Sequence, residues 1–141
     1  LKRFLEMRGA DGGPWRRICA LPAYWVGLLY DDSALAAADE LTADWTVEDV
    51  VAMRDTVPVQ GLKATVAGRS VMDVARETVS ISRDGLRNRK RLNEEGQDES
   101  VFLNPLDEVL AKKATLAEDL LAAYHGRWNQ SVLPVFDEYQ Y

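Results

Sequence analysis

The sequence predicts an α+β chain in which one strand leads and helices follow. Residues 1–8 alternate between a mostly apolar face and a face that ends in Glu6 and Arg8, as expected of a strand. The stretch GADGGP ends this strand, and Pro14 then suits the first position of a helix. After Trp15, apolar residues recur at helical spacing between capping signals, so we expect the remainder to be helical.

The later helices are predicted from local start and stop signals. Beyond segment 15–30, in which Pro22 predicts a kink or a break, the expected helices are 34–41, 47–55, 71–89, one beginning at Asn104-Pro105, 116–125 and one short helix in the tail. The expected caps are Ser33, Thr46 with Asp49, Ser70 with Asp73, and Thr115 with Glu118. Val57-Pro58 is expected to end the third helix, and Gly126 the last long one.

The leading strand needs partner strands, because a lone strand leaves its backbone N–H and C=O groups unsatisfied. The chain offers one weak candidate, LKATV, which lies beside glycines. We therefore expect the strand to belong to a larger antiparallel sheet supplied from elsewhere. On this interpretation, residues 1–141 are a single region from the C-terminal part of a longer protein, cut inside its sheet.

Length and composition limit the classes of protein. A chain of 141 residues that is 47% hydrophobic can form one domain with a core. Its net charge of −6 argues against non-specific nucleic-acid binding, and no apolar run approaches the roughly 20 residues that span a bilayer. A single cysteine, Cys19, and a single histidine exclude an internal disulfide and a Cys/His zinc site within the chain, and favour a reducing, cytoplasmic setting.

Five stretches resemble the glutamate–cysteine ligase family in the form found in plants and many proteobacteria. They are FLEMRGADGGPWRRICALPAYWVGLLYDD, ADWTVEDVVAMRDTVPVQGL, SRDGLRNR, FLNPLDEV and YHGRWNQSVLPVFDEY, in the same order along essentially the whole chain. Family members are longer, and this chain resembles their C-terminal third. The resemblance implies a glutamine-synthetase-like ligase fold, in which a curved, mainly antiparallel sheet lines the active site and helices lie outside.

The resemblance also implies an activity. The family joins the γ-carboxylate of glutamate to the amine of cysteine, with ATP as a substrate and Mg²⁺ as the metal, in the first step of glutathione synthesis. The expected partners are therefore L-glutamate, L-cysteine and ATP, with no nucleic acid or membrane. The expected location is the cytoplasm, or the plastid if the source is a plant. The sequence predicts no oligomeric state.

Glu6 and Arg8 are the central site prediction. Residues two apart in a strand share a face at about 7 Å. Mg²⁺ prefers carboxylate oxygens and substrate phosphates, and an arginine fork suits a moving phosphoryl group. The resemblance places Glu6 and Arg8 at the family's E-x-R strand positions, so we expect Glu6 to bind the metal and Arg8 to be catalytic. The alternative is an ion pair on a solvated strand.

Arg16 and Arg17 are predicted to bind phosphate, because two guanidinium groups at a helix start favour an anion. The alternative is an ion pair between domains. Trp15 and Trp25 are expected in the core. Cys19 resembles a position that in plant relatives joins a redox-regulatory disulfide, but a small buried apolar role is the simpler interpretation.

Two other functions remain open. One keeps the fold and changes the acceptor, giving a γ-glutamyl ligase for another amine or the related ligase of ergothioneine synthesis. The other is a non-catalytic helical interaction module. A reading frame that continues upstream favours a ligase, and an independent start codon favours the module. On the ligase interpretation, the isolated chain is expected to be inactive.

Overall fold

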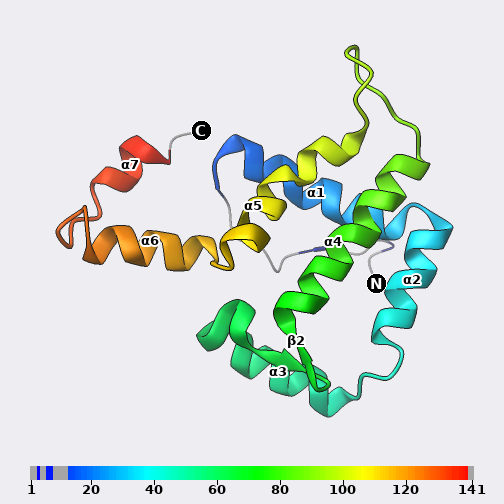
Figure 1. Ribbon diagram of the computed structural model, residues 1–141, viewed down its shortest axis with the longest axis horizontal. Helices are drawn as coiled ribbons and strands as arrows, with labels where there is room; N and C mark the ends of the chain where they lie inside the picture. The colour runs from blue at the N-terminus through cyan, green and yellow to red at the C-terminus, as the bar shows by residue number, and fades with distance from the viewer. Residues whose placement is uncertain (1–2, 4–5, 8–12, 140–141) are drawn as a thin grey trace.

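The computed structural model describes Arg3, Glu6, Met7 and residues 13–139. Its elements are α1 (Trp15–Leu29), α2 (Asp32–Thr42), α3 (Val47–Gln60), the 3₁₀ helix η1 (Gly61–Lys63), β1 (Thr65–Val66), β2 (Arg69–Ser70), α4 (Val71–Asn88), the 3₁₀ helix η2 (Glu99–Leu103), α5 (Asn104–Lys112), α6 (Leu116–His125) and α7 (Pro134–Glu138) (Figure 1). The described chain is thus mostly helical with one small hairpin. Within it, no helix has the length and apolar character that a membrane crossing requires.

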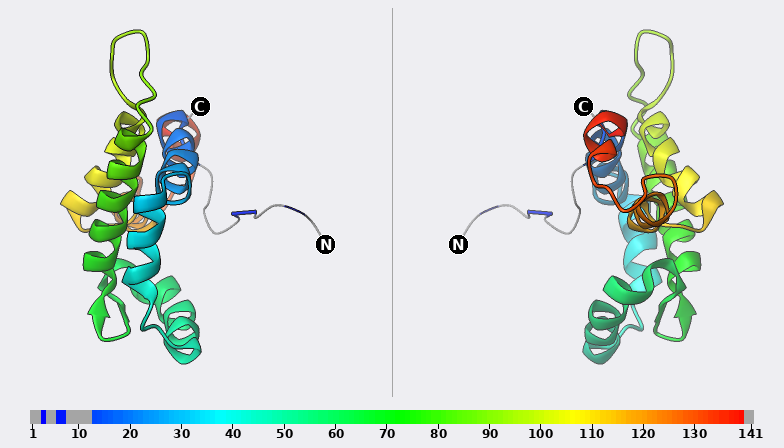
Figure 2. Two further views of the ribbon diagram at one scale, coloured as in Figure 1. Left: turned by 90° about the vertical axis from the view of Figure 1, so that its right-hand side faces the viewer. Right: turned by 90° about the vertical axis from the view of Figure 1, so that its left-hand side faces the viewer.

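Helices α1 and α4 cross at the centre of the molecule (Figure 1) and lie side by side in the two side views (Figure 2), and the core forms beside this crossing. Leu86 of α4 and Leu103 of η2 are fully buried and pack with Ala23 of α1. The crossing is close because two glycines face each other: a Cβ on Gly85 would overlap the Gly27 carbonyl oxygen. The Ser82 hydroxyl also donates a hydrogen bond to the Tyr24 carbonyl oxygen at 2.9 Å, so the contact is polar as well as tight.

The strands β1 and β2 form an antiparallel hairpin between α3 and α4. Thr65 pairs with Ser70 and Val66 pairs with Arg69. The two residues between the strands, Ala67 and Gly68, have φ angles of 47° and 74°, as a type I′ turn requires. The weak strand signal in LKATV is therefore confirmed at Thr65–Val66, and the coarse α+β class holds.

The predicted leading strand lies mostly outside the described residues. Arg3, Glu6 and Met7 are described, and none of them belongs to a strand. A strand forms only where a neighbour accepts its hydrogen bonds, and among the residues that the structure describes the short hairpin pairs only within itself. The larger sheet stays a prediction.

Several helix ends were predicted correctly because their signals are local. Thr46 with Asp49 and Thr115 with Glu118 both form complete capping boxes. Helix α5 begins at Asn104 with a proline in its first turn, and α6 ends at His125 before Gly126. The short helix expected in the tail is α7.

Two helix boundaries were predicted wrongly. Helix α2 is capped by Asp31 and not by Ser33, because the Asp31 carboxylate accepts the Ala34 N–H at 2.9 Å. Helix α3 runs past Pro58 to Gln60, since a proline near the end removes only one hydrogen bond; Gly61, with a φ of 54°, follows as its C-cap.

Three further expectations need correction. Pro22 lies inside a continuous α1, so of the predicted kink or break the break does not occur. Ser70 precedes α4, but its side chain makes no capping hydrogen bond. Trp15 is 70% exposed and so does not belong to the core, because it occupies the outer face of the first turn of α1. Trp25 is half-buried and packs edge-to-face on Tyr24.

Helices α6 and α7 form an arm that reaches away from the crossed helices (Figure 1). The arm has its own small packing centre, in which Trp128 is buried and donates a hydrogen bond to the Glu138 carboxylate at 2.8 Å. Arg127 also pairs with Glu138. Leu133 and Phe136 are about 70% exposed on this arm.

Candidate functional site

Glu6 is the one member of the predicted E-x-R pair that the structure describes. Its side chain is exposed and it lies in neither a helix nor a strand. Arg8, the predicted catalytic residue, lies outside the described residues, as do Asp11 and the glycines at 9 and 12. The shared face of Glu6 and Arg8 therefore stays a prediction.

The predicted magnesium site requires oxygen ligands, which carboxylates can supply. Among the described residues, no three His, Cys, Asp or Glu side chains gather closely enough to hold a metal ion by themselves. Protein-bound Mg²⁺ commonly has one or two carboxylate ligands, with substrate phosphates and water completing the octahedron. An exposed Glu6 fits the role of one such carboxylate. The remaining ligands would come from a substrate or from groups outside the described residues.

Arg16, at the start of α1, forms an ion pair with Glu108 of α5 at 2.5 Å. Both side chains are about half exposed, so the pair contributes roughly 0–1 kcal/mol to stability. This contact lies within the chain, whereas the predicted alternative was a pair between domains. An anion at Arg16 would compete with Glu108 for the guanidinium.

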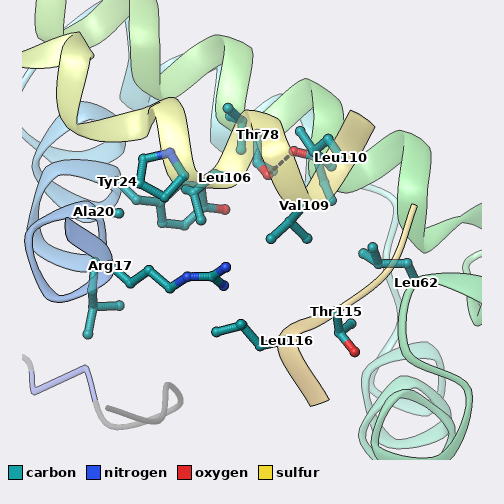
Figure 3. A pocket seen from close by; sticks show the side chains of 14 residues that line it. Arg17, Ala20, Tyr24, Leu62, Thr78, Leu106, Val109, Leu110, Thr115 and Leu116 are labelled. Carbon is teal, nitrogen blue, oxygen red and sulfur yellow. Dashed lines mark hydrogen bonds between the residues drawn. The ribbon is translucent and has the colours of Figure 1, made fainter. Parts of the chain in front are cut away.

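Arg17 has different surroundings from Arg16. Its half-buried side chain extends across an apolar groove where α1, α4, α5 and the start of α6 meet (Figure 3). Within the described part of the chain, no hydrogen bond or ion pair engages its guanidinium. The structure thus gives the two predicted phosphate-binding arginines separate environments.

Sequence reasoning missed the groove itself. Its walls come from segments far apart in the sequence, from Arg17 to Leu116, so no single stretch of sequence reveals it. A partial signal was present in α5, where Leu106, Val109 and Leu110 follow the i, i+3, i+4 spacing of one apolar helix face. That pattern marks an apolar face but does not identify what the face contacts.

Tyr24 lies at the groove with its ring among apolar side chains. Burial raises the pKa of the Tyr24 hydroxyl above its ordinary value of 10.0, and a hydrogen bond with Thr78 opposes this increase. The hydroxyl is therefore neutral at physiological pH, and Tyr24 is suited to hydrogen bonding and packing rather than to acting as a base.

Cys19 and His125 gain no catalytic role from their positions. Cys19 is half-buried on α1 and forms no disulfide with any described residue. His125 is the last residue of α6, and the C-terminus of a helix favours positive charge. Its ring contacts that of Tyr124 edge-to-face, with the ring centroids 5.0 Å apart.

Comparison with known proteins identifies the family. The model of "Glutamate-cysteine ligase family 2 (GCS2)" matches residues 1–138. The chain is 52% identical over all of its 141 residues to a chloroplastic glutamate–cysteine ligase of Arabidopsis thaliana, and 51% identical to that of Medicago truncatula. It is 49% identical to the chloroplastic enzyme of Solanum lycopersicum. The chain belongs to glutamate–cysteine ligase family 2.

The match covers all of this chain and a minor part of each relative. The 141 residues span 26% of the Arabidopsis thaliana protein and 27% of the Medicago truncatula protein. About three quarters of each relative therefore lies outside the stretch that matches this chain.

Proposed function

We propose that residues 1–141 form the C-terminal part of the catalytic domain of a glutamate–cysteine ligase. The complete enzyme would join the γ-carboxylate of L-glutamate to the amine of L-cysteine, with hydrolysis of ATP to ADP and phosphate. The observation that carries this proposal is the 52% identity over the entire chain with a relative named for that activity. The proposed fold is glutamine-synthetase-like, and the proposed location is the cytoplasm or, as in the named relatives, the plastid.

The proposed chemistry has two steps. In the first, an oxygen of the glutamate γ-carboxylate attacks the γ-phosphorus of ATP, and ADP leaves, which gives γ-glutamyl phosphate. In the second, the cysteine nitrogen attacks the acyl carbon, phosphate leaves and the nitrogen loses a proton. The first step brings two anions together, so it requires cationic groups held in place.

Arg8 and Glu6 are proposed to serve that first step. The guanidinium of Arg8 would donate two parallel hydrogen bonds to the moving phosphoryl group. The carboxylate of Glu6 would bind the Mg²⁺ that screens the phosphate charge. Arg16 and Arg17 stay predictions as phosphate contacts, although the apolar surroundings of Arg17 suit a phosphate poorly.

The proposal can be tested with a chimeric ligase, in which residues 1–141 replace the stretch that they match in the Arabidopsis thaliana relative. We expect this protein to form γ-glutamylcysteine from glutamate and cysteine only when ATP and Mg²⁺ are both present, as measured by mass spectrometry. A chimeric ligase that folds like the parent enzyme but forms no product would contradict the proposal. Activity with other amines in place of cysteine, measured on the natural protein, would favour the alternative acceptor.

A further inference from the structure

The groove at Arg17 is an open surface that is lined almost entirely by apolar atoms. It has a volume of about 370 Å³ and lies between α1, α4, α5 and the start of α6 (Figure 3). Its apolar side chains include Leu21, Leu62, Leu106, Val109, Leu110 and Leu116. Removing such a surface from water is favourable, in proportion to the apolar area that is buried.

The polar groups of the groove are satisfied, except for one charge. The Thr78 hydroxyl donates to the Ala75 carbonyl oxygen at 3.1 Å, and the Thr115 hydroxyl belongs to the capping box with Glu118. Arg17 is the charged residue in the lining, and no described residue pairs with it. Filling the groove would remove water from this guanidinium, which is costly unless an anion accompanies the apolar group.

The length of the relatives indicates what fills the groove. About three quarters of each relative lies outside the stretch matched here, and that part must pack against this one if the protein forms one catalytic domain. A polyphosphate is a poor match for walls made of leucine and valine side chains. A second copy is less suitable than a covalently linked segment, because each copy has a net charge of −6 and must lose its translational freedom to bind.

We propose that the groove is an intramolecular docking site for the rest of the ligase. An apolar segment from the part of the polypeptide outside residues 1–141 occupies it, and an Asp or Glu of that segment pairs with Arg17. This inference rests on the proposed function for the existence of that segment. It assigns the groove to assembly of the catalytic domain and not to a substrate.

Carbodiimide cross-linking tests the pairing, because the reagent joins a lysine amine to a carboxylate that already contacts it. The experiment uses the chimeric ligase with Arg17→Lys, and Arg16→Lys as the matched control. Arg16 has a partner in the structure, so Arg16→Lys is expected to cross-link to Glu108. Arg17→Lys is expected to cross-link to an Asp or Glu outside residues 1–141, identified by peptide mass spectrometry.

Hydroxyl-radical footprinting tests the apolar part without altering the groove. In the unsubstituted chimeric ligase, we expect Leu106, Leu110 and Leu116 to be oxidised less than Leu92, which is 64% exposed on the loop before η2. Arg17→Glu should increase their oxidation, whereas Arg16→Glu should not. This footprinting measurement keeps the proposal testable if the Arg17→Lys variant does not fold.

The results of these two experiments distinguish between the possible occupants of the groove. A cross-link from Arg17→Lys to a residue within 1–141, a cross-link to a second copy, or the absence of a cross-link together with fully oxidised groove leucines would each overturn the proposal. Ligase activity is scored independently, on the unsubstituted chimeric ligase. If that protein is inactive while Arg17→Lys forms the expected cross-link, the proposed function alone is contradicted. If that protein is active while its groove leucines are fully oxidised, the docking site alone is contradicted.

Discussion

Asp31 shows how a single carboxylate can determine where a helix begins. The Ser33 hydroxyl, the Ala34 N–H and the Asn88 side-chain amide all donate to it, and these hydrogen bonds hold the pKa of the Asp31 carboxyl below its ordinary value of 3.8. Asn88 ends α4, so the same carboxylate also joins the start of α2 to the end of α4. The capping residue therefore also makes a tertiary contact. The sequence favoured Ser33 as the cap and did not reveal this contact.

This arrangement predicts how stability depends on pH. Because the folded-state pKa of Asp31 is lowered, its contribution is complete above the unfolded value of 3.8 and is lost as the pH falls through the folded value. Asp31→Asn keeps a cap acceptor without a titrating group, so its unfolding midpoint should change less on acidification than that of the unsubstituted chain. Urea unfolding of the 141-residue chain at several pH values measures this.

The matched variant is Asp31→Ala, which removes the acceptor as well as the charge and should lower stability at neutral pH too. If Asp31→Asn loses stability with acid as steeply as the unsubstituted chain, the hydrogen bonds at Asp31 do not carry the effect.

Glu6 provides a second test at the scale of one residue. In the chimeric ligase, Glu6→Gln replaces the carboxylate that we propose as a metal ligand with an uncharged amide, whose oxygen attracts Mg²⁺ weakly. Half-activation should move to higher magnesium concentration, and the maximal rate should fall. A magnesium titration of initial rates measures both. If Glu6 served only in a surface ion pair, its loss would cost roughly 0–1 kcal/mol of stability and leave the magnesium dependence unchanged.

At the scale of elements, the α1–α4 crossing depends on glycine. A Cβ added at Gly85 would overlap the Gly27 carbonyl oxygen and lie 2.9 Å from the Ala34 Cβ. Gly85→Ala gains about 1 kcal/mol of helix propensity, but it forces apart two backbones at the core. We expect a net loss of about 1–3 kcal/mol, the usual range for overpacking, measured by denaturant unfolding.

Gly13→Ala is the control for this substitution. Its added Cβ would meet Arg17 side-chain atoms at 3.6 and 3.7 Å, which are ordinary contact distances. This variant should be close to neutral. A Gly85→Ala variant as stable as Gly13→Ala would mean that the two helices are not in backbone contact.

These elements also show what sequence can and cannot predict. The capping boxes at Thr46 and Thr115 were predictable because both partners lie within three residues of each other. The contact of Gly27 with Gly85 was not, because it depends on how two distant helices cross. For the candidate site, Glu6 and Arg8 were predicted from a local motif together with the family resemblance, and they stay predictions, whereas the groove at Arg17 exists only after the chain has folded.

At the scale of the whole molecule, we do not expect residues 1–141 to suffice for catalysis. Glu6 and Arg8 cannot by themselves bind ATP and two amino acids. We therefore expect the purified chain to form no γ-glutamylcysteine under conditions in which the chimeric ligase does. Product formed by the isolated chain in an ATP-dependent manner would show that a complete site lies within these residues.

The most direct test of the central claim is the rate of γ-glutamylcysteine formation by the chimeric ligase with Arg8→Lys. Lysine keeps the positive charge and loses the planar fork, so a phosphoryl group held by two parallel hydrogen bonds loses its support. We expect turnover to fall about 10²-fold or more, the scale of a lost transition-state stabiliser, while the circular dichroism spectrum and the unfolding midpoint stay as in the unsubstituted protein. Near-normal turnover by a correctly folded Arg8→Lys protein would contradict the claim that this chain supplies the phosphoryl-binding residue of the ligase.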